Sequence, residues 1–102
     1  MKKQFEQENI DNLLAELLAE TPKEQLLFVD FSMAIATRIV RILEEKGLKQ
    51  KDLAQMLGKT ELEISKWLSG THNFTLRSLA KIESVLGESL FAVESSQSVL
   101  VA

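Results

Sequence analysis

One predicted helix, residues 60–69, carries polar side chains at a spacing that gathers them on one face. At 100° per residue, Ile64, Trp67 and Leu68 fall on the same side of this helix. The opposite side holds one cation, two hydroxyl groups and one exposed leucine, which are Lys66, Ser65, Ser69 and Leu62. The two glutamates of the segment fall at the flanks, so the outward face is not acidic. It can therefore exchange hydrogen bonds with a polar partner, including a polyanion.

The residues around position 58 indicate how this helix is held. Ala54 is followed four residues later by Gly58, and Ile64 comes six residues after the glycine. Two helices that cross at a steep angle need this order. Alanine permits their close approach, glycine adopts the positive φ of the turn, and isoleucine fills the wedge between them. The spacing predicts a helix-turn-helix unit formed by residues 49–57 and 60–69.

A helix is also predicted ahead of Pro22. Apolar residues recur there at the i, i+3, i+4 spacing of an amphipathic helix, and they are Ile10, Leu13, Leu14, Leu17 and Leu18. The helix should end before Pro22, because the residue that precedes a proline avoids the helical conformation.

A long second helix is predicted to begin at the motif TPKE and to run to Lys46. We expect Thr21 as its N-cap, Pro22 at its first position and Glu24 as the partner in a capping box. The pattern leaves open whether the helix is interrupted near Ser32.

Three shorter helices are predicted over residues 49–57, 60–69 and 76–86. Thr60 with Glu63 predicts a capping box at the start of the middle one. A glycine follows each helix from the long one onward, where a left-handed terminating residue is expected, and these are Gly47, Gly58, Gly70 and Gly87. Helical periodicity dominates, so the predicted fold class is all-α. The predicted parts are a helical extension (1–30), a helix-turn-helix domain (31–87) and a C-terminal strand or flexible tail (88–102).

Charge is distributed unevenly along the chain. The net charge of −3 and the isoelectric point near 5.2 argue, on their own, against a nucleic-acid partner. However, residues 1–30 carry three lysines against seven acids, whereas residues 46–77 carry six basic residues against three acids. The predicted helix-turn-helix segment is therefore positive, at +3, while the N-terminal segment is at −4.

Several classes of function are disfavoured. With no cysteine, the chain has neither disulfides nor thiol nucleophiles, and its single histidine, His72, has no second metal ligand nearby. No serine, histidine and acid stand in a catalytic motif, so we expect no enzyme, no metal and no cofactor. No apolar run approaches the roughly 20 residues that cross a bilayer, and we expect a cytoplasmic protein with no membrane partner.

The stretch GLKQKDLAQMLGKTELEISKWLSGTHNFTLRSLAKIESVLG carries a specific pattern. It has a Gly-Leu-x-Gln lead-in, a Leu-Ala pair, a turn glycine, Ser-x-Trp and a Ser-Gly exit. Residues 36–87 thereby resemble the XRE family, the Cro and phage-repressor type of helix-turn-helix protein. The resemblance implies a lambda-repressor-like bundle of about five helices with an extra N-terminal helix. The N-terminal helices (10–46), placed before such a domain, also resemble antitoxin-type regulators of the HigA kind.

The resemblance implies binding to double-stranded DNA, with helix 60–69 in the major groove. Positions that would face the bases are Thr60, Glu61, Leu62, Ser65 and Lys66, and positions near phosphates are Lys49, Gln50, Lys59, Ser69, Thr71, His72 and Asn73. Lys66 can donate to guanine, Leu62 can pack on a thymine methyl group, and Glu61 can accept from cytosine N4. The family more often has Gln or Arg at positions 61 and 62, a departure that bears on the target sequence. For His72, a phosphate contact and a solvated side chain are both open.

Two functional classes remain. The first is a sequence-specific transcription regulator and repressor, with the antitoxin of a toxin–antitoxin pair as one form of it. The alternative is a protein–protein interaction module that keeps the scaffold without binding DNA. One helix reads only a few base pairs, so we expect a homodimer. Its interface would use Leu90, Phe91 and Val93 with residues 98–102, or the N-terminal apolar stripe.

Overall fold

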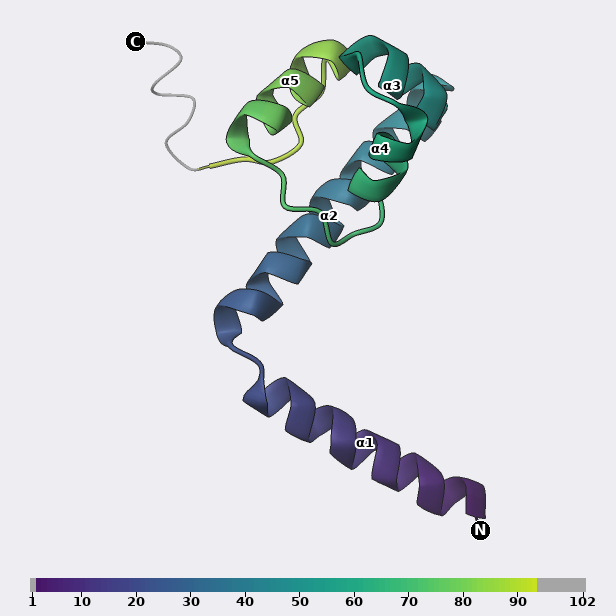
Figure 1. Ribbon diagram of the computed structural model, residues 1–102, viewed down its shortest axis with the longest axis vertical. Helices are drawn as coiled ribbons and strands as arrows, with labels where there is room; N and C mark the ends of the chain where they lie inside the picture. Colours follow the sequence, from purple (N-terminus) through teal and green to yellow (C-terminus); the bar gives the residue numbers. More distant parts are fainter. Residues whose placement is uncertain (1, 94–102) are drawn as a thin grey trace.

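The computed structural model describes residues 2–93, with side chains from residue 10 onward, and its regular structure over that range is entirely helical (Figure 1). The helices are α1 (Lys2–Glu20), α2 (Lys23–Lys46), α3 (Gln50–Leu57), α4 (Glu61–Trp67) and α5 (Leu76–Leu86). The all-α prediction is confirmed. Residues 88–93 carry no strand, so the strand alternative is wrong there, and residues 94–102 of that prediction lie outside the described residues.

The core lies where α2, α3, α4 and α5 meet. Five large side chains in it are fully buried, and they are Ile39, Ile42, Leu53, Ile64 and Ile82. They come from all four helices, which ties the helix-turn-helix pair to the C-terminal half of α2 and to α5. Leu90 is buried against the same cluster, so the chain returns to the core after α5.

The helix α1 extends away from this bundle (Figure 1). Its five predicted apolar residues, Ile10 to Leu18, are all exposed. The helix α2 is continuous through Ser32, so the interruption left open there does not occur. Its C-terminal half packs in the core, while its N-terminal half connects the bundle to α1.

The start of α2 differs from the prediction. The hydroxyl of Thr21 donates to the carbonyl of Leu17 at 2.6 Å, so it closes the last turn of α1 instead of capping α2. Pro22 is the N-cap of α2, and no side chain caps it, so the predicted capping box with Glu24 is wrong. A threonine hydroxyl can bond the carbonyl four residues before it, and here that bond is the one formed.

The end of α4 also differs. The helix stops at Trp67 with Leu68 as its C-cap, so Ser69 lies in the following turn. Gly47, Gly58 and Gly87 are left-handed C-caps as predicted. Gly70, with φ of 97°, lies beyond the cap and has a different cause, since a Cβ there would lie 3.1 Å from Cγ of Met33. A close approach of the backbone to α2 requires this glycine.

The segment after α5 is fastened to α2 by charge. Arg38 donates through Nε to the carbonyl of Ser89 at 3.1 Å. The carboxylate of Glu88 lies 3.9 Å from Nη2 of Arg38 and 4.0 Å from Nζ of Lys46. These contacts are half exposed, so they direct the chain toward the buried Leu90 more than they stabilise the fold.

Candidate nucleic-acid interface

The N-terminus of α4 is fixed by a capping box between Thr60 and Glu63. The Thr60 hydroxyl accepts from the backbone N–H of Glu63 at 3.1 Å, and the Glu63 carboxylate accepts from the backbone N–H of Thr60 at 2.7 Å. The same hydroxyl lies 3.2 Å from Oε2 of Glu63, to which it donates. Because the hydroxyl is used within the cap, the methyl group of Thr60 is what this side chain has left for a base.

The Glu63 carboxylate is committed to this cap in its charged form. Its pKa is lowered, first because the Thr60 backbone N–H donates to it, and further by the Thr60 hydroxyl and the positive charges of Lys59 and Lys66. Partial desolvation opposes the shift. Glu63 therefore serves the helix start, and its charge is offset by neighbouring lysines.

Of the four residues predicted on the outward face, Leu62, Ser65 and Lys66 lie on α4, whereas Ser69 lies in the turn beyond it. Glu61, Leu62, Ser65 and Lys66 are exposed, and Ile64 between them is fully buried. Leu62 is 66% exposed, so its apolar side chain is open to a partner. The four exposed side chains can reach a partner together, because the burial of Ile64 fixes the rotation of the helix.

The start of α3 lies on the other arm of the helix-turn-helix pair. Lys49 is its N-cap and Gln50 its first residue, and both are exposed. The carboxylate of Asp52 accepts from the backbone N–H of Lys49 at 2.8 Å. This bond uses the main chain of Lys49 and leaves its ammonium group available for a phosphate.

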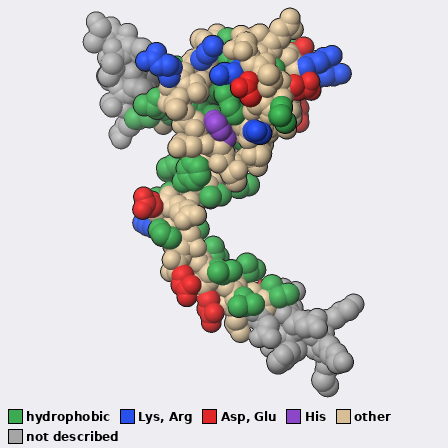
Figure 2. Space-filling view, in the orientation of Figure 1, with side chains coloured by type: hydrophobic (Ala, Val, Ile, Leu, Met, Phe, Trp, Pro, Cys, Tyr) green, Lys and Arg blue, Asp and Glu red, His purple; other side chains and the backbone are tan. Residues whose placement is uncertain are grey.

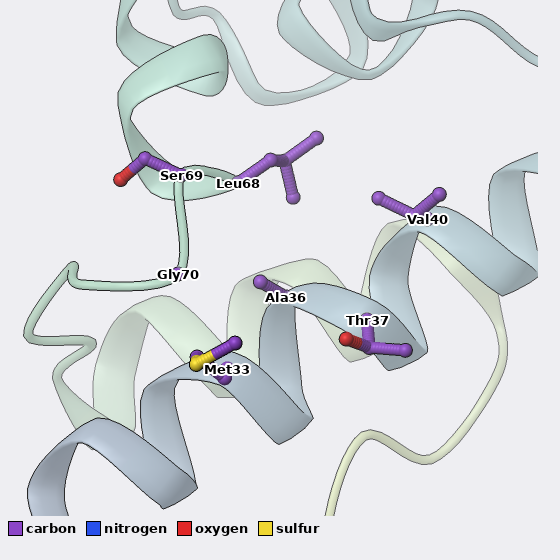
Figure 3. Close-up of a pocket in the computed structure, with 7 residues that line it drawn as sticks. All are labelled: Met33, Ala36, Thr37, Val40, Leu68, Ser69 and Gly70. Atoms are coloured by element: carbon purple, nitrogen blue, oxygen red, sulfur yellow. The ribbon is translucent and has the colours of Figure 1, made fainter. Parts of the chain in front are cut away.

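The turn after α4 is braced against α2. The Ser69 hydroxyl donates to the carbonyl of Lys66 at 2.7 Å and lies 3.3 Å from the Thr71 hydroxyl. Behind it, Gly70 and Leu68 face Met33 and Val40 of α2 across a shallow apolar cavity of about 220 Å³ (Figure 3). The hydroxyl bonds of Ser69 therefore hold two predicted phosphate contacts, Ser69 and Thr71, next to the end of α4.

An aromatic cluster, formed by Trp67, His72 and Phe74, follows in the exit loop. The rings of Trp67 and His72 are stacked, with centroids 5.4 Å apart, and His72 meets Phe74 edge-on at 4.7 Å. Partial burial lowers the pKa of His72, so the ring is mainly neutral at pH 7. His72 is thus half-buried against two rings, and a phosphate contact through a ring N–H and a solvated side chain both stay predictions. Asn73, which lies between His72 and Phe74 in the sequence, is exposed.

A basic pocket lies beside this cluster, and sequence reasoning missed it. Lys59, Arg77 and Lys81 line a cavity of about 200 Å³ together with Trp67. The ammonium of Lys59 is 5.9 Å from the centroid of the Trp67 ring, and that of Lys81 donates to the carbonyl of Leu57 at 3.2 Å. The only signal in the sequence was the excess of cations in residues 46–77, because Lys81 lies far from Lys59 along the chain.

Basic side chains are concentrated on the bundle, which also carries acidic ones. Figure 2 shows most of the Lys and Arg side chains on the helical bundle, whereas acidic and apolar side chains cover the visible part of α1. Among the described residues no three His, Cys, Asp or Glu side chains gather as metal ligands, and none of the helices in this range is long and apolar enough to cross a membrane.

Comparison with known proteins bears on the bundle. A profile of the helix-turn-helix family matches residues 39–93, just over half of the chain. The match covers α2 from Ile39 to its end, all of α3, α4 and α5, and the segment that follows to Val93. Searches of curated proteins and of solved structures gave no significant match.

Proposed function

Because the chain belongs to the helix-turn-helix family of DNA-binding transcription regulators, we propose that it binds a specific duplex sequence and represses transcription from it. In this proposal α4 enters the major groove with Glu61, Leu62, Ser65 and Lys66 toward the base edges. The observation that carries it is the exposed, non-acidic face of a helix whose opposite residue, Ile64, is fully buried.

The phosphate contacts in this proposal come from two sides of α4. Lys49 and Gln50 approach one strand from the start of α3, and Ser69, Thr71 and Asn73 approach the other from the braced exit loop. Lys59 lies at the turn between α3 and α4, next to the start of the reading helix. His72 contributes a neutral ring N–H, so its contact is weaker than that of a lysine.

The experiment is selection of duplexes from a random library, followed by gel shifts at several salt concentrations. We expect one preferred sequence, bound at least about 10³-fold more tightly than random duplexes at physiological salt. The logarithm of the binding constant should fall linearly with the logarithm of the salt concentration. A scrambled duplex of the same composition is the control. If no duplex is bound even at about 50 mM salt, the proposal is wrong.

A second function is proposed for α1. Its exposed apolar residues and the net charge of −4 over residues 1–30 suit a basic protein partner, as in the antitoxin of a toxin–antitoxin pair. Co-expression with the product of the adjacent reading frame tests it. An antitoxin should relieve growth arrest by that product and bind it. A chain lacking residues 1–20 should fail to do so.

A further inference from the structure

The helix α1 presents a continuous apolar stripe to solvent. Its members are between 50% and 58% exposed, and they are Ile10, Leu13, Leu14, Leu17 and Leu18. On the helical wheel they span about 140°, with Glu20 about 20° and Glu16 about 60° outside one edge of this arc. A stripe of this width is the contact face of a helix that packs on another surface.

A matching apolar groove lies on the bundle. A cavity of about 460 Å³ is formed by the N-terminal half of α2, the start of α5 and the segment after α5, and its lining includes Phe31, Ile35, Leu76, Leu79 and Phe91. Leu76 is 74% exposed and Phe31 61% exposed at its rim. A single chain thus carries two large apolar surfaces, and no residue among 10–93 covers either of them.

The link between the two surfaces directs α1 away from the groove. It consists of Thr21, bonded to the carbonyl of Leu17, and Pro22, whose ring fixes φ at −57°. The groove begins at Phe31, eight residues further along α2, or about 12 Å at the helical rise. With this link α1 extends outward (Figure 1), so its stripe faces other molecules and not its own groove.

We propose that α1 of one copy of the chain occupies the groove of a second copy, and that the second copy returns the same contact. When the same two copies exchange both contacts, the assembly is closed and two-fold. It covers four apolar surfaces at once, two stripes and two grooves. The charge of −4 over residues 1–30 also favours approach to a body whose residues 46–77 carry +3.

The chain contains no cysteine, so single cysteines can report which surfaces meet. Leu14→Cys marks the stripe, Leu76→Cys the groove, and Ser65→Cys, on the exposed face of α4, is the matched control. Each variant is purified reduced, and pairs are mixed and oxidised. We expect a disulfide-linked dimer of unlike chains from Leu14→Cys with Leu76→Cys, at least about tenfold above either pairing with Ser65→Cys.

Other pairings give different products. If Leu14→Cys or Leu76→Cys cross-links with itself as well as with its proposed partner, the stripes or the grooves pair alike and the exchange is wrong. The double variant in one chain should give linked dimers, and a linked monomer instead would mean that α1 folds on its own groove. All of these variants are made in the full-length chain.

Light scattering at tens of micromolar gives an independent readout. Leu14→Glu and Phe31→Glu each change an exposed side chain, so helix content by circular dichroism should be retained while the dimer dissociation constant rises about tenfold or more. Leu62 is an exposed leucine outside both surfaces, so Leu62→Ser should leave the dimer dissociation constant unchanged. This inference rests on the proposed DNA-binding function. The experiments distinguish failure of the exchange from failure of DNA binding. A folded monomer that binds the selected duplex would overturn the exchange alone.

Discussion

The ring of His72 is stacked on the ring of Trp67, with the two planes 19° apart. This contact joins the exit loop to Trp67, the last residue of α4. The loop that the sequence places beside a phosphate therefore also packs against the end of that helix. Lys59 lies near the same indole. Aromatic packing therefore acts together with the hydrogen bonds of Ser69 to position the loop relative to α4.

The stack predicts the titration of His72. Its pKa should lie below 6.5, the value of an ordinary histidine, because partial burial disfavours the charged ring. Since this is the only histidine of the chain, one NMR resonance reports it. A pKa at or above 6.5 in the free protein would contradict the stack. Bound DNA should raise the pKa if the ring lies against a phosphate, and leave it unchanged otherwise.

The same shift has a consequence for stability. A folded-state pKa below the unfolded one means that the unfolded chain binds more protons, so the free energy of unfolding falls as pH drops below about 6.5. His72→Phe keeps a stacked ring but cannot titrate. Urea denaturation between pH 5 and 8 should therefore show a smaller loss at low pH in this variant than in the parent. Equal losses would show that His72 does not contribute.

The start of α4 gives a second test. Thr60→Ala removes the hydroxyl that accepts from Glu63 N–H and should lower the free energy of unfolding by about 0.5–2 kcal/mol. Ser65→Ala, on the exposed face of the same helix, is the control and should cost little.

Because the pKa of Glu63 is lowered, the stability from its cap is present above about pH 4.5 and is lost as pH falls through the folded-state pKa. Thr60→Ala should weaken this acid-dependent loss.

The bundle follows from local signals in the sequence. The box at Thr60 and Glu63, the cap at Thr75 and the glycines at positions 58 and 87 each act within one turn of the chain. They locate α3 and α5 to within a residue, and the start of α4 likewise. Helix starts of this kind are predictable, because the groups that satisfy the free backbone N–H are neighbours in sequence.

Other features depend on choices between competing partners. Thr21 had two helix ends within reach, and its hydroxyl bonds back to Leu17. Arg38 reaches Ser89, 51 residues away, which no local pattern indicates. The stack of His72 and the approach of Gly70 to Met33 likewise arise from packing between distant segments. The sequence identifies the outward face of α4 but not the loop geometry beside it.

The two lysines of the proposed interface should behave differently. As a base contact, Lys66→Ala should cost about 1–3 kcal/mol on the preferred duplex and reduce discrimination at one position. Lys49→Ala should weaken all duplexes alike and lower the salt slope by about one unit. Binding of both variants to a site library, at several salt concentrations, separates the two. Identical profiles would show that the reading face is assigned wrongly.

The side chains of Glu61 and Leu62 carry the last prediction. Leu62 is 66% exposed on the outward face, and Glu61 lies at its flank in the first turn of α4. A carboxylate beside phosphates is repelled unless a cytosine amino group donates to it, so Glu61 should penalise wrong sequences more than it strengthens binding to the right one. Glu61→Gln should accordingly raise binding to random duplexes and lower the preference for the selected one.

Leu62→Ala should lose a thymine methyl contact and act mainly at one A·T position. Competition between selected and random duplexes measures both effects. If neither variant changes affinity or selectivity, while a protein partner is lost, this face of α4 serves protein binding and not DNA.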